Sequence, residues 1–223
     1  MRAKMRVSAF NLVDLLNQPS HQHILRQFHN KKFHKGERVS DSYIRDDNVF
    51  IVSSGQLRVF LSYGDREFTL YFLESGDIFS THTRAYIEAV KESVILMLPT
   101  KIFRQHLSTH PDMALQMTGI LGDMLGSSWD VIEGIIFHDA KTRLIAFILS
   151  LGKERGVVTE NGTEFECDLT MEDISLIIGS TRQTTSSLFN VLIKDGDIVR
   201  ICKNKYAIGD IIALSTRLAE YKA

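Results

Sequence analysis

Arginine and glutamine stand side by side at Arg182 and Gln183, inside a run of hydroxyl residues. Arginine can donate two hydrogen bonds to guanine O6 and N7, and glutamine can pair with adenine N6 and N7. The hydroxyl side chains that can reach phosphates or bases are Thr181, Thr185 and Ser186 or Ser187. A second group of cations follows at Arg200, Lys203 and Lys205. Together these residue types favour contacts with double-stranded DNA.

Two short helices must present these side chains. Thr170 precedes the acidic residues Glu172 and Asp173, which is typical of a helix N-terminus. Gly179 then interrupts the apolar pattern, and Ser180 or Thr181 can cap a second helix. The predicted buried faces are Ile174, Ile177 and Ile178 in the first helix and Thr184, Leu188, Val191 and Leu192 in the second. This pattern indicates a helix-turn-helix, whose second helix enters the major groove.

The residues after these helices predict a basic β-hairpin with strands at 198–201 and 206–208. Such a hairpin is a wing and completes a winged helix-turn-helix. Residues 168–223 carry as many acidic as basic residues, so the cations are local to Arg182 and the wing. The alternative is a winged-helix module that binds protein. DNA is favoured because Arg182 and Gln183 have no evident packing purpose.

Residues 33–100 have a different pattern. Short β-branched and aromatic runs alternate with turn residues about every 8–12 positions. These runs include 49–52, 57–61, 68–73 and 94–98. They predict an antiparallel β-roll, or jelly roll. Because helices precede and follow the roll, the expected fold class is α+β.

A long helix is predicted over 112–137, with Pro111 placed to open it. A heptad-like seam of alternating threes and fours is formed by Met117 or Thr118, Leu121, Leu125, Ser128, Ile132 and Ile135. Gly119, Gly122 and Gly126 indicate close backbone approach, since glycine costs about 1 kcal/mol in a helix interior. We expect a homodimer through this helix. The alternative is an amphipathic helix that packs on its own domain.

The patterns divide the chain into a β-roll domain at 1–110, a dimerisation helix at 111–137 and a winged helix-turn-helix domain at 138–223. His138 and Asp139 lie where the long helix meets the next predicted helix, at 142–151, and they suit either a hinge or a cap. Residues 152–162 are charged and contain glycine, which predicts a loop.

The composition of the 223 residues, 44% hydrophobic and 24% charged with net charge −1, is ordinary and names no partner. Cys167 and Cys202 are too few for a disulfide scaffold, a four-thiolate zinc site or an iron–sulfur cluster. No apolar run reaches the about 18 residues of a membrane span. Asn11 and Asp14 interrupt any signal-peptide core, so we expect a cytoplasmic protein without membrane contact.

Four of the eight histidines lie early, at His21, His23, His29 and His34. A metal site is one interpretation. A solvated surface is favoured, because no cysteine or carboxylate stands at ligand spacing. No nucleophile and base are paired anywhere in the pattern, so we do not expect an enzyme.

The succession of β-roll, long helix and winged helix-turn-helix resembles the CRP/FNR family of bacterial transcription regulators over nearly the whole chain. The strongest signature is 174–185, ISLIIGSTRQTT, which is similar to the DNA-reading element of that family. The resemblance implies a homodimer that binds near-palindromic DNA and acts on RNA polymerase. It also implies an effector that binds the β-roll and changes promoter activity, with activation the expected direction.

Residues 76–85, GDIFSTHTRA, bear on the effector. Cyclic-nucleotide members carry a Gly-Glu pair and an Arg-Ser/Thr-Ala run, whereas here the segment is short and Arg84 is followed directly by Ala85. Iron–sulfur members use an N-terminal cysteine cluster, which this sequence lacks. The segment instead resembles the haem-ligand segment of the carbon-monoxide-sensing haem branch, the CooA type. The stretches that also resemble this branch are 57–61, 67–70, 120–122 and 137–139.

This resemblance implies one haem b per subunit, with His82 as the imidazole ligand to iron. The other axial ligand would be the N-terminal amine of the partner subunit, here that of Met1. Carbon monoxide would displace the amine and switch the dimer to its DNA-binding form. An apolar slot for haem is expected from Phe72, Phe79 and Tyr86 near strand ends and from Leu121, Gly122 and Leu125 on the long helix.

One departure from the branch concerns the ferric ligand. The branch usually has cysteine two residues before the histidine, and here that residue is Ser80. A serine hydroxyl is a poor iron ligand, so we expect a ferric spectrum without thiolate features. Two alternatives to the haem sensor stay open. One is a CRP/FNR-type regulator that answers another small molecule without haem, and the other, which is disfavoured, is a haem enzyme or electron carrier.

Overall fold

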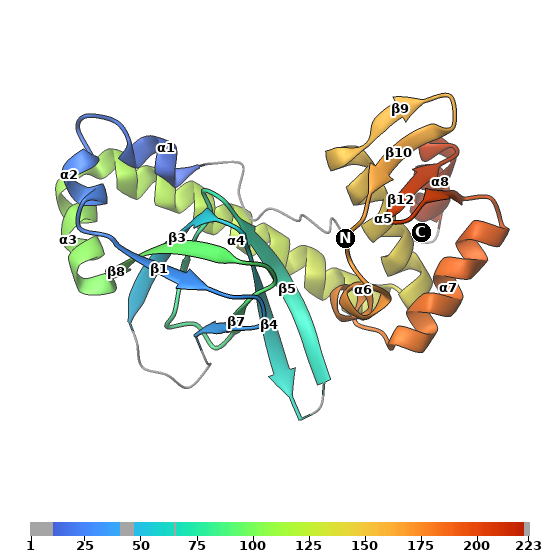
Figure 1. Ribbon diagram of the computed structural model, residues 1–223, viewed down its shortest axis with the longest axis horizontal. Helices are drawn as coiled ribbons and strands as arrows, with labels where there is room; N and C mark the ends of the chain where they lie inside the picture. Colours follow the sequence, from blue (N-terminus) through green and yellow to red (C-terminus); the bar gives the residue numbers. More distant parts are fainter. Residues whose placement is uncertain (1–10, 41–46, 65, 221–223) are drawn as a thin grey trace. The chain divides into compact units, whose positions relative to one another are not determined.

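The computed structural model describes residues 11–40, 47–64 and 66–220. The described residues up to Ser127 form one compact unit, the N-terminal unit, and those from Ser128 form a second, the C-terminal unit. Figure 1 shows the elements of both. Helices of the N-terminal unit are α1 (Leu12–Leu16), α2 (Gln22–Leu25), α3 (Thr100–Thr109) and the first part of α4 (Pro111–Phe137). Its strands are β1 (His29–Phe33), β2 (Arg38–Ser40), β3 (Asn48–Ser54), β4 (Gln56–Tyr63), β5 (Arg66–Glu74), β6 (Ile78–Ser80), β7 (Tyr86–Ala89) and β8 (Ser93–Pro99).

The strands of the N-terminal unit form two antiparallel sheets, in the orders β1-β8-β3-β6 and β2-β7-β4-β5. Residues between the sheets belong to one core, with Phe50 and Val52 from β3 facing Leu57 from β4 and Leu73 from β5. Alternate residues of a strand point to opposite faces, so Val49 and Ile51 lie in a second core. The expected β-roll and the α+β fold class are confirmed.

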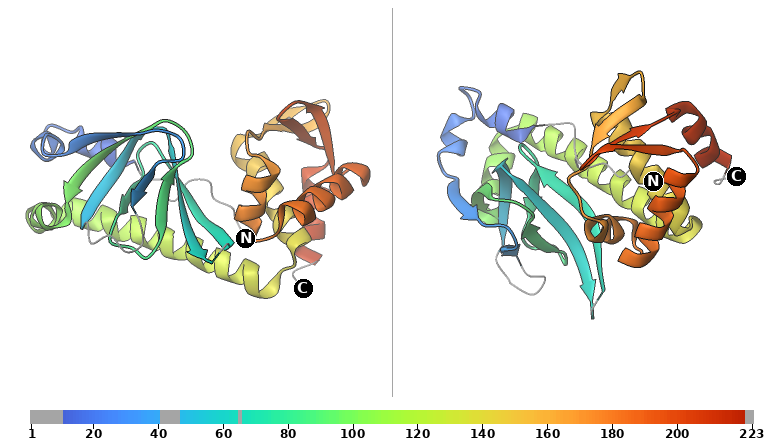
Figure 2. Two further views of the ribbon diagram at one scale, coloured as in Figure 1. Left: turned by 60° about the horizontal axis from the view of Figure 1, so that its bottom comes forward. Right: turned by 45° about the vertical axis from the view of Figure 1, so that its right-hand side comes forward.

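The second core lies between the first sheet and the helices. It contains Leu12 and Leu16 from α1, Ile24 from α2 and Phe103 from α3. Met113 and Ile120 of α4 are also buried there, so the first half of α4 packs on the roll, as Figure 2 shows. Sheet and helices thus bury β3 on both faces.

The opposite face of α4 is exposed and apolar. Leu121 and Leu125 are 59% and 57% exposed, and Trp129 is 61% exposed. Apart from the helix's own backbone, no atom of the described chain lies within 4 Å of a Cβ built at Gly122, or at Gly119 or Gly126. The close approach predicted for these glycines is therefore not made by the described part of this chain. No helix within the described ranges is long and apolar enough to cross a membrane.

The C-terminal unit is built around α5 (Ala140–Arg155), whose residues 144–149 are buried around the whole helix. The other helices are α6 (Met171–Ile178), α7 (Arg182–Lys194) and α8 (Ile211–Glu220). The strands β9 (Val157–Thr159), β10 (Gly162–Glu166), β11 (Ile198–Cys202) and β12 (Lys205–Ile208) form one sheet in the order β11-β12-β10-β9. The expected winged helix-turn-helix is confirmed, since β11 and β12 are the wing.

Local chemistry sets the boundaries of α6 and α7. Thr170 and Asp173 form a capping box, in which the Thr170 hydroxyl accepts from the Asp173 N–H at 3.1 Å. Gly179 has φ 64°, the left-handed conformation that ends α6 and suits glycine. Thr181, and not Ser180, is the N-cap of α7 and accepts from the Thr184 N–H at 3.1 Å. Asp139 caps α5 in the same way, accepting from the Thr142 N–H at 2.7 Å.

Two predictions for the C-terminal unit are wrong. The loop at 152–162 is instead the end of α5 followed by β9. A Cβ at Gly152 would lie 2.6 Å from Ile208 Cδ1, so this glycine allows close packing against β12 inside a continuous helix. Of the predicted buried face of α7, Leu192 is buried, whereas Leu188 is half-buried and Thr184 and Val191 are exposed. The other buried residues of α7 are Thr185 and Phe189. Phe189 determines this register, because it packs edge-on against Tyr206 of β12 with ring centroids 5.2 Å apart.

The early histidines separate in the structure. His29 and His34 are exposed, whereas His21 is 2% exposed and its Nε2 lies 3.0 Å from Asp112 Oδ2. The His110 ring lies 5.3–6.2 Å from the rings of His21, His23 and His106 of α3, and the centroids of His23 and His106 are 5.9 Å apart. Within the described ranges no group of three or more such side chains is arranged to hold a metal ion. We name His21, His23, His106 and His110 the histidine cluster.

The histidine cluster predicts a loss of stability at mildly acidic pH. Burial lowers the pKa of His106 below 6.5, and the neighbouring His23 and His110 lower it further. A histidine whose pKa is lowered in the folded state contributes stability above pH about 6.5, and this contribution is lost as the pH falls from that value through the lower pKa of the folded state. We expect the free energy of unfolding to fall between pH 7.5 and 5.5, and to fall less in His106→Gln, measured by urea denaturation.

A matched control is His34→Gln, because His34 lies outside the histidine cluster and is exposed. It should keep the pH dependence of the unchanged protein. Equal pH dependence in His106→Gln and in the unchanged protein would contradict the prediction.

Candidate functional site

The start of α7 presents the two residues predicted to read bases. Arg182 and Gln183 occupy its first turn, directly after the N-cap Thr181, and all three are exposed. The described residues supply no hydrogen bond or ion pair to the Arg182 guanidinium. Side chains at the start of a recognition helix are those that face base edges in a major groove. The exposure of Arg182 and Gln183 is what such contacts require.

The hydroxyl residues that follow do not all share this surface. Ser187 is exposed and Ser186 is half-buried. Thr185 has no exposed surface and lies on the buried face of α7. Its assignment to the DNA contacts is therefore corrected to a packing role, because a fully buried side chain cannot reach a duplex.

The wing supplies the second group of cations. Arg200 and Lys203 are exposed, and Asn204 turns the hairpin with φ 62°. Lys205 is half-buried and its Nζ lies 2.7 Å from Glu164 Oε2 on the neighbouring strand β10. Hydrogen bonds from Lys205, Asn161 and Thr159 lower the pKa of Glu164 to about 2, and Glu164 raises the pKa of Lys205. The pair stays ionised, so the charge of Lys205 is compensated whereas those of Arg200 and Lys203 face solvent.

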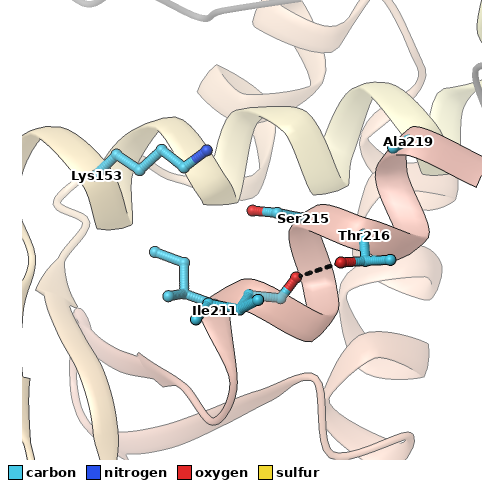
Figure 3. Close-up of a pocket in the computed structure, with 6 residues that line it drawn as sticks. Lys153, Ile211, Ser215, Thr216 and Ala219 are labelled. Carbon is cyan, nitrogen blue, oxygen red and sulfur yellow. Dashed lines mark hydrogen bonds between the residues drawn. The ribbon is translucent and has the colours of Figure 1, made fainter.

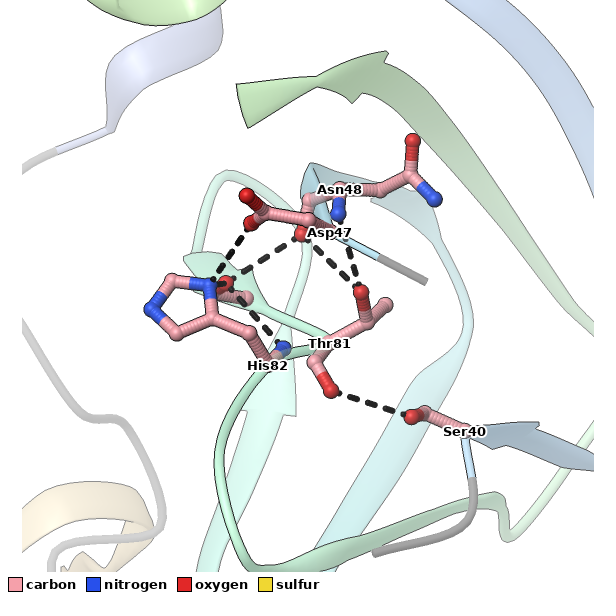
Figure 4. Close-up of polar contacts among 6 residues, drawn as sticks. Ser40, Asp47, Asn48, Thr81 and His82 are labelled. Atoms are coloured by element: carbon pink, nitrogen blue, oxygen red, sulfur yellow. Dashed lines mark hydrogen bonds and ion pairs between the residues drawn. The ribbon is translucent and has the colours of Figure 1, made fainter. Parts of the chain in front are cut away.

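The second candidate region is the end of β6, where His82 follows directly after Ser80 and Thr81. The segment is joined to the start of β3, because the Thr81 N–H donates to the Asn48 carbonyl at 2.9 Å. The Thr81 hydroxyl also accepts from the Asn48 N–H at 3.0 Å. Figure 4 shows these contacts and the Ser40 hydroxyl donating to the Thr81 carbonyl at 3.2 Å. The backbone that carries His82 is thus held by side chain and main chain.

The imidazole of His82 is held through one of its two nitrogens. Nδ1 lies 3.2 Å from Asp47 Oδ1 and is hydrogen-bonded to the Ser80 hydroxyl. The Ser80 hydroxyl also donates to the Asn48 carbonyl at 3.2 Å, so toward His82 it acts as acceptor. Two oxygen acceptors favour the tautomer with the proton on Nδ1, which leaves the Nε2 lone pair available. The side chain is 55% exposed, and Figure 4 shows its second nitrogen on the side away from Asp47.

The residues predicted to line a haem slot do not form one group. Phe79 is 7% exposed and packs against Phe50 and Tyr71 in the core, at centroid distances of 6.3 and 6.4 Å. Phe72 is also buried, and Tyr86 stacks on Phe60. On α4, Leu121, Gly122 and Leu125 lie on the exposed face instead. The structure gives Phe79 a core role, and its contact with haem stays a prediction. Met1 lies outside the described residues.

Two residues next to these candidate sites were not predicted from the sequence. Asp47 lies beside His82, and the Arg143 guanidinium reaches the turn of the helix-turn-helix. Asp47 is far from His82 along the chain, so only the pairing of β3 with β6 reveals it. The sequence could have indicated a special role for Arg143, because a cation in the first turn of a helix interacts unfavourably with the helix dipole.

A groove of about 450 Å³ lies in the C-terminal unit between α5 and α8 (Figure 3). Its lining is mostly apolar, with Ile211, Ile212 and Ala219 from α8, and Lys153 lies at its edge. Thr216 directs its hydroxyl to the Ile212 carbonyl at 3.0 Å rather than into the groove. Lys153 is the one titratable side chain among the described residues that line it, so no acid–base chemistry converges there.

Residues 142–217 match the model of the Crp-like helix-turn-helix domain. A global nitrogen regulator from Synechocystis sp. is 28% identical over 183 residues, which are 82% of this chain and 72% of that protein. Among solved structures, a double mutant of CooA from Carboxydothermus hydrogenoformans is 34% identical, with a TM-score of 0.90 over 96% of this chain and 99% of that one. The reduced CO-sensing protein from R. rubrum is also 34% identical, with a TM-score of 0.55 over 94% of this chain and 98% of that one.

The β-roll, the long helix and the winged helix-turn-helix with an exposed reading surface define a DNA-binding transcription regulator. The chain belongs to the CRP/FNR family.

The two groups of cations predict different effects on DNA binding. Arg182→Ala should weaken specific binding by about 1–3 kcal/mol, because a bidentate contact to guanine is lost. Lys203→Ala should reduce the salt dependence of binding by about one phosphate contact. Lys205→Ala should change it less, because Glu164 already compensates this charge. Fluorescence anisotropy at several salt concentrations, with a duplex that the unchanged protein selects from a random pool, measures all three.

Normal specific binding by Arg182→Ala would show that the predicted register of α7 on DNA is wrong. An effect of Lys205→Ala as large as that of Lys203→Ala would show that the Glu164 pair opens on binding.

Proposed function

We propose that the protein is a haem-dependent, carbon-monoxide-sensing transcription regulator that acts as a homodimer and activates its promoters. The observation that carries this proposal is His82. It stands in a segment that resembles the haem-ligand segment of the CooA type, and its Nδ1 is held by Ser80 and Asp47 while Nε2 is available. Metal-ligating histidines characteristically donate the other ring N–H to a carboxylate or other oxygen, which orients the ring.

Two features of the described residues support a haem group, although the predicted lining residues do not form one slot. His82 would supply the imidazole ligand, and Leu121 and Leu125 offer exposed apolar surface of the kind that haem contacts. Bound haem would supply an iron centre that takes up carbon monoxide when ferrous. Ser80 and Asp47 keep the His82 ring in one orientation and hold the Nδ1 proton. The second ligand, the N-terminal amine of the partner subunit, stays a proposal. The contacts of Phe79 and Gly122 with haem and the stoichiometry of one haem per subunit are also proposals.

Similarity to solved CO-sensing proteins supports this effector, and similarity to a global nitrogen regulator favours a second candidate. That candidate is a regulator of the same family that answers another small molecule without haem. The absorption spectrum of haem-loaded protein decides between them. A six-coordinate ferrous spectrum that carbon monoxide converts to a sharp carbonyl Soret band supports the haem sensor. Lack of stoichiometric haem uptake supports the second candidate.

The exposed face of α4 supports a homodimer. Besides Leu121 and Leu125, Ile132 and Ile135 are 46% and 50% exposed, so four seam positions are open to water in the single chain. A contiguous apolar face of this kind is typical of an interaction surface. The open space at Gly122 allows a second backbone to approach closely. In the proposed dimer Ile132 and Ile135 pack against the same residues of the other subunit.

Substitution of the ligand gives the sharpest test of haem binding. His82→Ala should lose the six-coordinate ferrous spectrum and the carbon-monoxide-dependent binding of DNA, because the imidazole ligand is removed. His34→Ala, another exposed histidine, is the control and should keep both. Retention of both properties by His82→Ala would remove His82 from the site. The ferric protein should lack thiolate features, because both cysteines, Cys167 and Cys202, lie in the C-terminal unit.

Substitution of the seam tests the dimer. Ile132→Glu should raise the dimer dissociation constant about a hundredfold, because a carboxylate would be buried without a partner. Gln116→Glu adds the same charge on an exposed position of α4 outside the seam and should leave it unchanged. Sedimentation equilibrium measures both. Dissociation by the two variants alike would mean that charge on α4, and not packing of the seam, controls association.

A further inference from the structure

Arg143 lies in the first turn of α5, where its charge opposes the helix dipole. Its side chain reaches three backbone carbonyls. Nη1 donates to the His138 carbonyl at 2.5 Å, Nε to the Ile178 carbonyl at 2.5 Å and Nη2 to the Gly179 carbonyl at 3.2 Å. Nε and Nη2 thus point to the end of α6, and Nη1 points to the end of α4.

All three acceptors lie at the C-terminal ends of helices. His138 follows directly after α4, Ile178 is the last residue of α6 and Gly179 is its C-cap. Carbonyls at such ends have no partner within their own helix and carry the negative end of the helix dipole. A single guanidinium thus caps two helices, which offsets its unfavourable place in α5. Burial lowers the pKa of Arg143, but arginine stays protonated at any physiological pH.

The two capped ends have different neighbours. On one side is the junction of α4 and α5, where Asp139 begins α5. On the other side is the turn that leads through Ser180 to Thr181, the N-cap of the reading helix α7. The turn is also hydrogen-bonded to α6, because the N–H groups of Gly179 and Ser180 both donate to the Ser175 carbonyl. A displacement at residue 138 must therefore either break a charged hydrogen bond or carry the turn with it.

We propose that Arg143 is the positioning residue that couples the junction of α4 and α5 to the reading helix α7. Arg143 does not contact DNA in this proposal; it acts through the Ile178 and Gly179 carbonyls. Lysine cannot replace it, because one ammonium group cannot reach three carbonyls in the geometry of a planar fork. The inference concerns DNA binding and holds whether or not the effector is carbon monoxide.

Coupling between two sites is reciprocal, so DNA bound at α7 should be sensed at the junction. The experiment is hydrogen exchange by mass spectrometry on the full chain, with haem and carbon monoxide supplied throughout, with and without a duplex that the unchanged protein selects from a random pool under the same conditions. In the unchanged protein, DNA should slow exchange in α7 and also in residues 134–142. In Arg143→Lys at saturating duplex, α7 should still be protected while the protection of 134–142 by DNA disappears.

Free Arg143→Lys should also exchange about tenfold faster at 134–142 and at 176–181, since hydrogen bonds to a charged group are lost at both. Lys141→Gln removes the neighbouring cation of the same helical turn and should behave as the unchanged protein. General destabilisation would speed exchange with and without DNA but would leave the difference intact. DNA protection of 134–142 that persists in Arg143→Lys, or that is absent from the unchanged protein, overturns the proposal. Failure to bind haem leaves these outcomes unaffected.

Discussion

Burial of β3 on both faces is the constraint on which the N-terminal unit depends. Phe50 and Val52 enter the core between the two sheets, and Ile51 enters the core under the helices. Because the strand cannot slip by one residue without exchanging these faces, its register is strongly determined. Asn48 at its start then binds Thr81, which determines where His82 stands. The helix core on the outer side places α4, so one strand positions both the candidate ligand and the candidate dimer helix.

The C-terminal unit depends in a similar way on α5, a helix that is apolar and buried around its whole circumference. A helix of this kind is the centre of a unit and not a surface element. Gly152 lets β12 approach it, and the aromatic contact of Phe189 with Tyr206 sets the rotation of α7. That rotation turns Thr185 inward and leaves Arg182, Gln183 and Ser187 outward. Packing on the inner side therefore selects which side chains are free to read DNA.

Several charged residues of the described chain act through specific local contacts, although the net charge is only −1. Glu164 compensates Lys205, so the wing presents Arg200 and Lys203. Asp47 Oδ1 lies 3.2 Å from His82 Nδ1. The Arg143 guanidinium donates to backbone carbonyls at two helix ends. In each case the partner comes from another element, so the effect of a charged residue follows from its contacts and not from the composition.

The elements that local chemistry specifies could be predicted from the amino-acid sequence: the β-roll strands, α4 opened by Pro111, and α6 and α7 with the cap at Thr170 and the glycine turn at 179. These features depend on period, caps and turn residues, which act over a few positions. The sequence also singled out His82 through a resemblance. Contacts between distant segments were needed to define the buried face of α7, the pairing of Asp47 and Ser80 with His82, the strand β9 in place of a loop and the carbonyls that Arg143 contacts. The reason is that spacings of three and four residues leave more than one helix face possible, and contacts between distant segments select among them.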